Sequence, residues 1–222
     1  MEVLAWLLAG VAGYLPGSVP AGFIAGRLKG IDLRKVGSGN IGATNAIRNL
    51  GTGVGVVVLL LDAMKGLLPC LFFPALLIGL FPEGSAPTME TLRLVVGVSA
   101  ILGHNYTFWL GFKGGKGIAT TAGVVGGLAP IPFAVCLGSW VLAFAVTRYV
   151  SLASIAAAVA LPIAAAAWPS DTENRFGLLF WIFLFLGVMA IWKHRSNIQR
   201  LMNGTEHRVG SGNGSDQAEG AS

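Results

Sequence analysis

The sequence predicts an all-α protein, a polytopic integral membrane helix bundle with seven transmembrane helices. Three observations lead to this prediction. Of the 222 residues, 54% are hydrophobic and only 11% are charged, and the mean hydropathy is +0.71. The apolar residues form separate segments, each close to the roughly 20 residues that a helix needs to cross a bilayer. The charged residues gather between these segments, as they do in the loops of membrane proteins.

Five of the predicted spans are continuous apolar segments. They run from Val3 to Gly26, Val54 to Phe81, Leu92 to Leu110, Val150 to Trp168 and Phe176 to Trp192. The first span has no basic region before it and is too long for a cleaved signal peptide, so we expect it to be retained. The apolar stretch from Gly117 to Thr147 could form one long helix or two short ones. Because Pro130 and Pro132 would interrupt a helix, we predict two.

Basic residues predict the orientation of these spans. The first loop carries five of them: Arg27, Lys29, Arg34, Lys35 and Arg48. The positive-inside rule places this loop in the cytoplasm and the N-terminus outside. With seven crossings the basic C-terminal segment is also cytoplasmic, and Pro169 to Asn174 is outside. Arg93 and Arg175 then lie on the outer side, as exceptions to the rule. Five spans are the alternative, but one crossing would be nearly twice the necessary length.

We expect residues 1–207 to form a single transmembrane domain, because the length suits one compact unit and no linker divides it. Residues 208–222 contain almost no apolar residue to bury, which predicts a disordered tail. Cys70 and Cys136 lie in apolar segments, where small buried hydrophobes are expected rather than a disulfide or a metal site. The net charge of +5 is accounted for by cytoplasmic loops, so no nucleic acid partner is expected.

The first polar loop has the sequence GSGNIGATNAIRNLG, Gly37 to Gly51. Its small polar residues are Ser38, Asn40, Thr44 and Asn45. Together with freely turning glycines, these residues can form an anion-binding nest. Arg48 adds a guanidinium whose paired N–H groups match phosphate oxygens. An ordinary flexible loop is the alternative, because glycine and asparagine are also common turn residues.

The second polar loop has the sequence GFKGGKGIATTAG, Gly111 to Gly123. Its candidate phosphate-binding residues are Gly114, Gly115, Lys116, Gly117 and Thr120. The glycines could direct backbone N–H groups at one anion, beside the lysine and the N-terminus of the following helix. The segment is not a nucleotide P-loop, because Leu110 stands at the first glycine position and glycine follows the lysine. A basic loop on anionic lipid headgroups is the alternative.

The third polar segment, KHRSNIQRLMNGTEH, directly follows the last span. His194 could bind phosphate or act as a base, and Asn197 would lie on the same helical face. The basic cluster could also be only an orientation signal. Glu206 is expected to be a structural partner for nearby arginines. No His, Cys, Asp and Glu set has metal-ligand spacing, so no catalytic metal is expected.

Asp62 and Lys65 stand three residues apart inside the second predicted span. Charged residues within a membrane helix are costly unless they pair or serve a site. This spacing puts both on one helical face, so we predict a structural ion pair directed toward the interior of the bundle.

Together the three polar segments resemble the three signature motifs of the bacterial acyl-phosphate:glycerol-3-phosphate acyltransferase family. They stand in the same order between Gly37 and His207, although Tyr106 replaces the proline that is usual after GHN. The resemblance implies a multi-pass enzyme of the bacterial inner membrane whose active site faces the cytoplasm. It implies transfer of a fatty acyl group from acyl phosphate to the 1-hydroxyl of sn-glycerol 3-phosphate. The products would be lysophosphatidic acid and inorganic phosphate, without a cofactor or obligatory protein partner.

The family roles carry over to Ser38, Arg48, Lys116, His194 and Asn197 as catalytic residues, to the glycine-lysine loop as a substrate-binding segment and to Glu206 as a structural residue. Either His194 or a substrate phosphate oxygen could take the proton, and the shortage of carboxylate bases in the loops favours the phosphate. Ser38 as a covalent nucleophile is a third option, but no base neighbours it in sequence. A small transporter of a phosphorylated compound is the alternative from another class, and a scaffold without catalytic activity is a further one.

Overall fold

The computed structural model of the chain describes residues 2–82, 87–168 and 177–210, and all regular elements in these ranges are helices. In chain order they are α1 (Glu2–Ser18), α2 (Ala21–Leu28), α3 (Ala43–Leu50), α4 (Thr52–Ile78), α5 (Met89–Asn105), the 3-10 helix η1 (Phe108–Leu110), α6 (Ile118–Leu128), α7 (Pro130–Thr147), α8 (Val150–Ala167), α9 (Leu178–Lys193) and α10 (Arg195–Met202). The predicted all-α class is therefore correct. The predicted outer segment at 169–174 and the tail beyond 210 lie outside the described residues.

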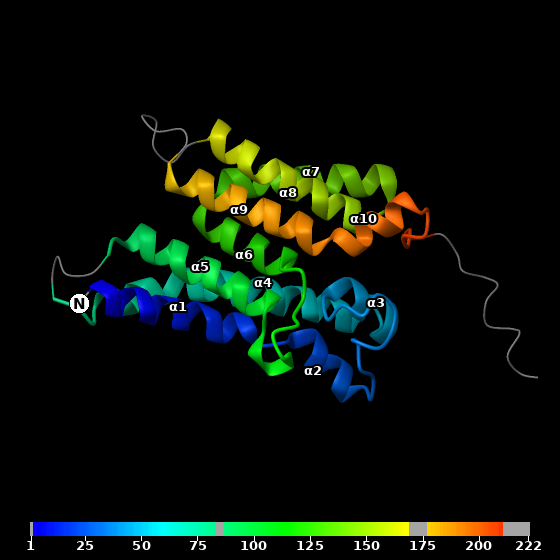
Figure 1. Cartoon of the computed structure of the whole chain (residues 1–222), viewed down its shortest axis with the longest axis horizontal. Helices are drawn as coiled ribbons and strands as arrows, with labels where there is room; N and C mark the ends of the chain where they lie inside the picture. The colour runs from blue at the N-terminus through cyan, green and yellow to red at the C-terminus, as the bar shows by residue number, and fades with distance from the viewer. Residues whose placement is uncertain (1, 83–86, 169–176, 211–222) are drawn as a thin grey trace, which may run out of the picture.

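The long helices run side by side along the long axis of the molecule (Figure 1). The N-terminus lies at one end, and α2, α3 and α10 gather toward the other. Successive long helices alternate in direction, so the segments before α3, before α6 and around α10 come to the same end. This arrangement brings the three polar segments of the sequence together.

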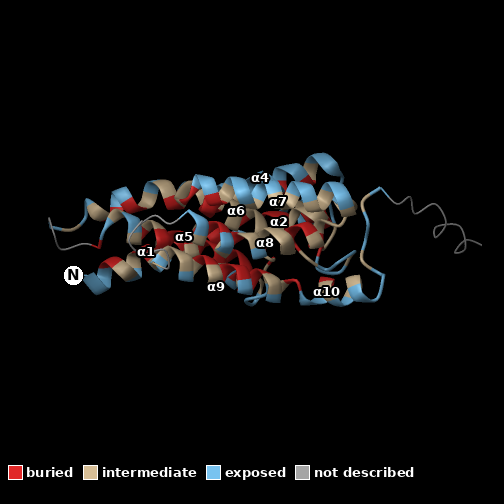
Figure 2. Cartoon of the chain, turned by 90° about the horizontal axis from the view of Figure 1, so that it is seen from above, coloured by how far each residue is buried: buried red, intermediate tan, exposed pale blue. Residues whose placement is uncertain are grey.

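Much of the surface of the bundle is apolar, as expected for helices in contact with lipid. Figure 2 shows exposed residues along the outer faces of α4 and α7 and buried residues between the helices. Within the described residues, four segments are long and apolar enough to cross a membrane: Glu2–Leu28, Thr52–Ile78, Pro130–Thr147 and Val150–Ala167. A fifth is obtained if α9 and α10, which meet at a bend of 54°, form one span. Length and composition thus select four or five spans, fewer than the seven predicted.

The chain does break at the predicted proline pair. Helix α6 ends at Leu128 and α7 begins at Pro130, whose missing N–H is harmless in the first turn of a helix. Helix α6 has only 11 residues and is about 16 Å long, shorter than the roughly 30 Å hydrocarbon core of a bilayer. Its length therefore explains why α6 is not among the segments long enough to cross a membrane.

The first predicted span, Val3 to Gly26, agrees with the candidate span Glu2–Leu28 but contains a break, and the predicted end of the third span was wrong. The first apolar segment is two helices, because the chain leaves α1 at Val19 and Pro20 before α2 begins. The third ends at Asn105, five residues before Leu110. The hydroxyl of Thr107 donates to the carbonyl of Ser18 at 2.6 Å and helps to hold the chain after α5 in a turn. Contacts with α1 therefore decide where α5 stops.

The first polar segment is also more ordered than a flexible loop, because half of it forms α3. Ala43, Ala46, Ile47 and Leu50 occur at helical spacing, and Ala46 is fully buried. Ile47 packs so closely on Gly55 of α4 that a Cβ there would overlap it. This short apolar stripe was visible in the sequence but was overlooked among the turn residues.

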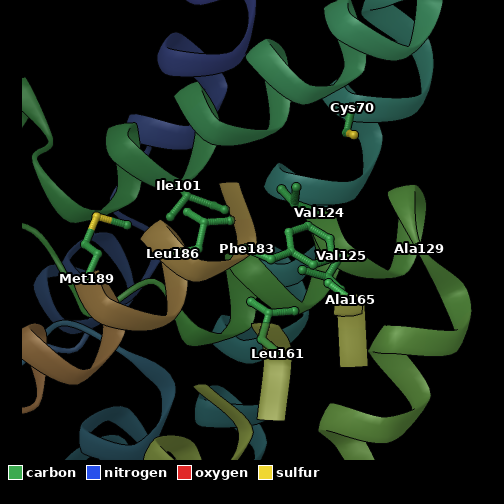
Figure 3. Packing of buried hydrophobic residues seen from close by; sticks show 10 residues of the cluster. All are labelled: Cys70, Ile101, Val124, Val125, Ala129, Leu161, Ala165, Phe183, Leu186 and Met189. Carbon is green, nitrogen blue, oxygen red and sulfur yellow. The ribbon is translucent and has the colours of Figure 1, made fainter. Parts of the chain in front are cut away.

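Small residues allow the helices to approach one another closely. Gly13 and Gly17, one turn apart on α1, face the backbone of Val96 and Ala100 on α5, where a side chain would overlap carbonyl oxygens. Between α5, α6, α8 and α9 lies the main apolar core, with Phe183 among its fully buried members (Figure 3). These contacts fix the helix ends that carry the polar segments.

Candidate active site

A cavity of about 680 Å³ opens where the three polar segments meet. Its polar end is lined by five candidates from all three segments: Ser38, Arg48, Lys116, His194 and Asn197. Further along, the lining becomes apolar and comes from α6, α7, α8 and α9, through Val125, Phe133, Leu161 and Leu186. The cavity can therefore hold a molecule with an anionic head and a long apolar chain.

A smaller cavity of about 230 Å³ shares Ser38, Asn40 and Lys116 with the large one. Its other lining residues are polar or basic: Gly39, Gly114, Gly115, Lys193, Arg195, Ser196 and Arg200. Four cationic side chains around so small a space favour a compact anion. Lys116 lies at the junction of the two cavities.

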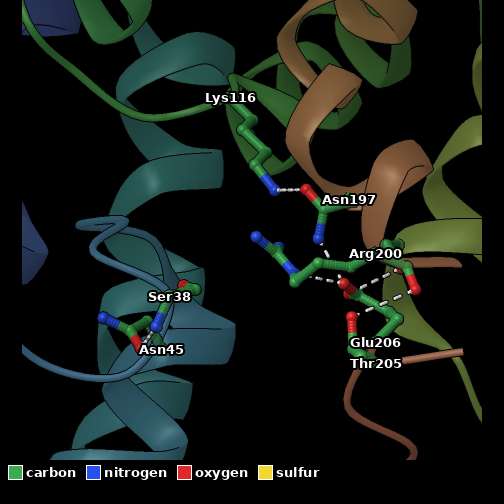
Figure 4. Close-up of polar contacts among 8 residues, drawn as sticks. Ser38, Asn45, Lys116, Asn197, Arg200, Thr205 and Glu206 are labelled. Carbon is green, nitrogen blue, oxygen red and sulfur yellow. Dashed lines mark hydrogen bonds and ion pairs between the residues drawn. The ribbon is translucent and has the colours of Figure 1, made fainter. Parts of the chain in front are cut away.

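A chain of hydrogen bonds orients Lys116 and Asn197 (Figure 4). The ammonium of Lys116 contacts the side-chain oxygen of Asn197, and the amide nitrogen of Asn197 donates to Glu206 at 2.8 Å. The same carboxylate accepts from Ser151 at 2.8 Å and pairs with Arg200 at 2.7 Å. Because Glu206 takes the NH₂ end of the amide, the oxygen of Asn197 must face the lysine. The predicted structural pairing of Glu206 with an arginine is present.

Asn45 organises the first polar segment. Its side-chain oxygen accepts the N–H of Ser38 at 3.0 Å, and its NH₂ group donates to the carbonyls of Leu33, Val36 and Asn40 at 3.0, 3.1 and 2.9 Å. These bonds use the hydrogen-bonding capacity of the amide. Asn45 therefore positions Ser38 beside the cavities, and because it also lines the large one its contact with substrate stays a prediction.

The glycine loop is built differently from the predicted anion nest. The N–H groups of Gly114 and Gly115 donate to the carbonyls of Asn105 and His104 at 3.2 and 3.1 Å, so they are already engaged. A Cβ on Gly114 would overlap the His104 carbonyl, and one on Gly115 would overlap the His104 ring. Both glycines are needed for close packing on the end of α5. The backbone donors left for an anion are those at the N-terminus of α6, which have no intrahelical partners.

Three buried side chains, those of His104, Asp62 and Lys65, pack behind the glycine loop. The ring of His104 lies against Gly115, and its Nδ1 is 3.6 Å from the carboxylate of Asp62. Asp62 pairs with Lys65 at 2.8 Å, and the ammonium of Lys65 also donates to the carbonyl of Val19 at 2.8 Å. The ion pair predicted from sequence is thus present inside the bundle, and it connects α4 to the loop through His104.

The environment of the site adjusts its titratable groups. Burial lowers the pKa of Lys116 to about 8, so its charge is sensitive to pH near neutrality. Burial and the nearby Lys116 lower the pKa of His194 to about 4, so the imidazole is neutral. The Nδ1 of His194 faces the carbonyl of Ala190 at 2.8 Å; if this nitrogen carries the proton, Nε2 is left as an acceptor. Burial would raise the pKa of Glu206, but hydrogen bonds from Asn197, Arg200 and Ser151 lower it overall.

Most of the residues predicted from sequence meet at the two cavities. Those that line one or both are Ser38, Asn40, Thr44, Asn45, Arg48, Asp62, Gly114, Gly115, Lys116, Gly117, His194, Asn197 and Glu206. Gly37 and Thr120 do not. Gly37, with φ of 55°, packs on the Asn45 amide, and Thr120 is fully buried and packs on Gly66 of α4. Lys65 is also outside the lining, as expected for a structural residue.

Sequence reasoning missed three contributors to the site. Ser151 binds Glu206 from the start of α8, and a serine in an apolar segment gives no signal of this role. Lys193 donates to the carbonyl of Asn105 at 2.9 Å and lies 4.2 Å from the centre of the Tyr106 ring. Arg195 lines the smaller cavity. The basic residues were noticed only as an orientation signal.

The fold and the site define a class of protein: an integral membrane protein, helical in its described residues, with a cavity that is cationic at one end and apolar at the other. Comparison with known proteins gives the family. The glycerol-3-phosphate acyltransferase family model matches residues 7–204. The chain belongs to this family.

Relatives of known name cover nearly the whole chain. Glycerol-3-phosphate acyltransferase of Chlorobaculum tepidum is 40% identical over 95% of this chain and 99% of its own length. The Geobacter sulfurreducens protein of the same name is 45% identical over 91% of this chain and 96% of its own. The crystal structure of PlsY, an integral membrane glycerol 3-phosphate acyltransferase, in its glycerol 3-phosphate form aligns with a TM-score of 0.80 and 37% identity, covering 92% of this chain and 96% of PlsY. Its lysophosphatidic acid form gives a TM-score of 0.77 and 36% identity, covering 92% and 95%.

Proposed function

We propose that this protein transfers a fatty acyl group from acyl phosphate to the 1-hydroxyl of sn-glycerol 3-phosphate. The products are lysophosphatidic acid and inorganic phosphate, and the reaction is the first acylation of bacterial phospholipid synthesis. The observation that carries the proposal is the large cavity, whose cationic mouth continues into an apolar interior. A phosphorylated headgroup and an acyl chain are the two parts that such a cavity matches. The family relationship supports the acceptor, and the mixed character of the cavity supports acyl phosphate as the donor.

We infer the orientation in the membrane from the basic residues of the first loop and of the segment after α9. We assign seven crossings to α1, α4, α5, α6, α7, α8 and α9, with the N-terminus outside and α10 in the cytoplasm of a bacterial inner membrane. In this assignment the 11-residue α6 and the 18-residue α7 cross the membrane in opposite directions. We assign residues 1–207 to one domain, and directly after it the N–H of Val209 donates to the carbonyl of Arg148 at 3.0 Å. A cytoplasmic site gives access to soluble glycerol 3-phosphate, while the acyl chain enters from the bilayer.

The two cavities suggest where the two substrates bind. The acyl chain occupies the apolar part of the large cavity, and glycerol 3-phosphate occupies the smaller basic cavity. Lys116 lies between them and can contact both phosphates, with Arg48 on the large-cavity side and Arg200 on the other. An acyl phosphate is already activated, so positioning is the main requirement, and positioning can supply about 7 to 11 kcal/mol of the barrier. The cationic groups stabilise the negative charge that develops on the phosphate leaving group.

The reaction then needs no enzyme nucleophile. The 1-hydroxyl oxygen attacks the acyl carbon, the bond from that carbon to the phosphate oxygen breaks, and the hydroxyl proton passes to a phosphate oxygen. Glu206 is bound by three partners and is poorly placed to act as a base. The neutral His194 could accept a hydrogen bond at Nε2, which would orient the hydroxyl. No cofactor or protein partner takes part in this scheme.

The test is an assay of purified protein in lipid for phosphate release that requires both palmitoyl phosphate and glycerol 3-phosphate. Lys116→Ala and Arg48→Ala should abolish release, while Lys113→Ala, on the same loop but outside both cavities, should retain it. Release without glycerol 3-phosphate, or undiminished activity in Lys116→Ala, would refute the proposal. Near-normal turnover of His194→Gln would exclude the histidine as the base. Mass spectrometry after mixing with acyl phosphate alone should detect no acylated Ser38.

A further inference from the structure

The apolar end of the large cavity meets the buried core cluster that contains Phe183, and we infer that Phe183 sets the length of the acyl chain that the cavity accepts. This inference rests on the proposed acyl transfer, because it concerns the same cavity. It assigns a role in selectivity to a residue that touches neither phosphate and lies in no polar segment.

The length of the cavity follows from the helices that line it. On α8, the lining residues Ser151, Ser154, Ala158 and Leu161 occupy one helical face. The axial distance from Ser151 to Leu161 is about 15 Å at 1.5 Å per residue. One leaflet of a bilayer core is also about 15 Å thick. The protein can therefore enclose most of an ordinary fatty acyl chain.

Three buried residues surround the deep end: Val125, Leu161 and Leu186 are 2%, 4% and 2% exposed. One turn further from the mouth, α8 carries Ala165 and α9 carries Phe183, while Ala129 follows α6. The two alanines are too small to fill the space between the helices.

Phe183 fills that space. Its side chain is fully buried, and it belongs to the same core cluster as the three residues at the deep end. Figure 3 shows its ring directed toward Val125 and Ala165, with Leu161 and Leu186 nearby. A chain that passed Leu161 and Leu186 would meet this ring.

Replacing Phe183 by alanine would leave a layer of three alanines and deepen the cavity by about one helical turn, about 5 Å. This is about a third of the length of a chain that spans one leaflet. Each additional methylene buried there should raise kcat/KM about fourfold. The preferred acyl phosphate should therefore become longer by about four carbons.

The experiment measures kcat/KM for even-numbered saturated acyl phosphates from decanoyl to arachidoyl at a fixed glycerol 3-phosphate concentration. Phe183→Ala should move the optimum to longer chains, and Phe183→Leu should move it less. Ala157→Leu, which adds bulk to the cavity lining one turn before Leu161, should move it to shorter chains. Phe185→Ala is the matched control, because this phenylalanine on the same helix is 51% exposed on the lipid side and should leave the profile unchanged.

The Ala157→Leu variant keeps the inference testable if Phe183→Ala does not fold, as judged by size-exclusion chromatography. Identical chain-length profiles for wild type, Phe183→Leu and Ala157→Leu would overturn it, because the chain would then leave the cavity sideways into the bilayer. A wild-type protein that accepts no acyl phosphate of any length would instead refute the proposed function, and the chain-length role with it.

Discussion

Raising the pH from about 7 to about 9 should weaken substrate binding through the loss of one charge, that of Lys116. Burial lowers the pKa of this lysine to about 8, so the group is protonated below that pH and neutral above it. About ten in eleven molecules carry the charge at pH 7, and about one in eleven at pH 9. If only the protonated form binds phosphate productively, kcat/KM should fall about tenfold over this range.

Neither His194 nor the substrate phosphate obscures this transition. His194, with a pKa of about 4, is already neutral, and phosphate monoesters are dianionic above pH 7. The measurement is phosphate release at low substrate concentration, with pH as the variable. Bound dianions favour the charged lysine, so kcat should fall at higher pH than kcat/KM does.

Lys116→Arg is the matched variant, because a guanidinium keeps its charge throughout this range. Its kcat/KM should be flat between about pH 7 and pH 9, whatever its absolute value. A wild-type profile without a decrease near pH 8, or an arginine variant with the same decrease, would refute the assignment of the transition to Lys116.

Three further predictions concern the supports of the site. Glu206→Gln removes the carboxylate that Arg200, Asn197 and Ser151 bind and should destabilise the protein by about 2 kcal/mol. Thermal unfolding in detergent measures this, and an unchanged midpoint would contradict it. Gly115→Ala puts a methyl group into the imidazole beneath the loop and should raise the KM for glycerol 3-phosphate, whereas Gly138→Ala, where a methyl group meets open space, should leave it unchanged. Asp62→Asn removes the carboxylate that pairs with the buried Lys65 and should lower the unfolding temperature. Replacing both Asp62 and Lys65 by leucine should restore part of the lost unfolding temperature. An equal decrease of the unfolding temperature in the two variants would argue against the ion pair.

Short-range patterns in the sequence were enough to predict much of the fold. Apolar segments predicted the long helices, and Pro130 predicted the break between α6 and α7, although Pro69, Pro74 and Pro162 lie inside continuous helices. The boundaries failed where distant contacts decide them. Helix α5 stops at Asn105 in a turn that contacts the end of α1, and α3 forms because its apolar face has α4 to pack against.

The composition of the site could also be predicted in part. Ser38, Arg48, Lys116, His194 and Asn197 were chosen because cationic and small polar residues bind phosphate, and all five line one cavity. The reason for the glycines was wrong. Gly114 and Gly115 permit contact with α5, and no local pattern distinguishes such a glycine from one that frees an N–H group for an anion.

The sequence by itself determined that this protein lies in a lipid bilayer, where its helical segments are and which chemical groups are available to bind phosphate. Composition and local spacing encode these properties. Only the tertiary structure decided that Ser151 supports Glu206, that His104 underlies the glycine loop and that Phe183 packs in one cluster with Leu161 and Leu186 of the cavity lining. The physical reason is that each of these roles depends on a partner on another helix. Packing sets which helices meet and at which turn, and that information is distributed over the whole chain.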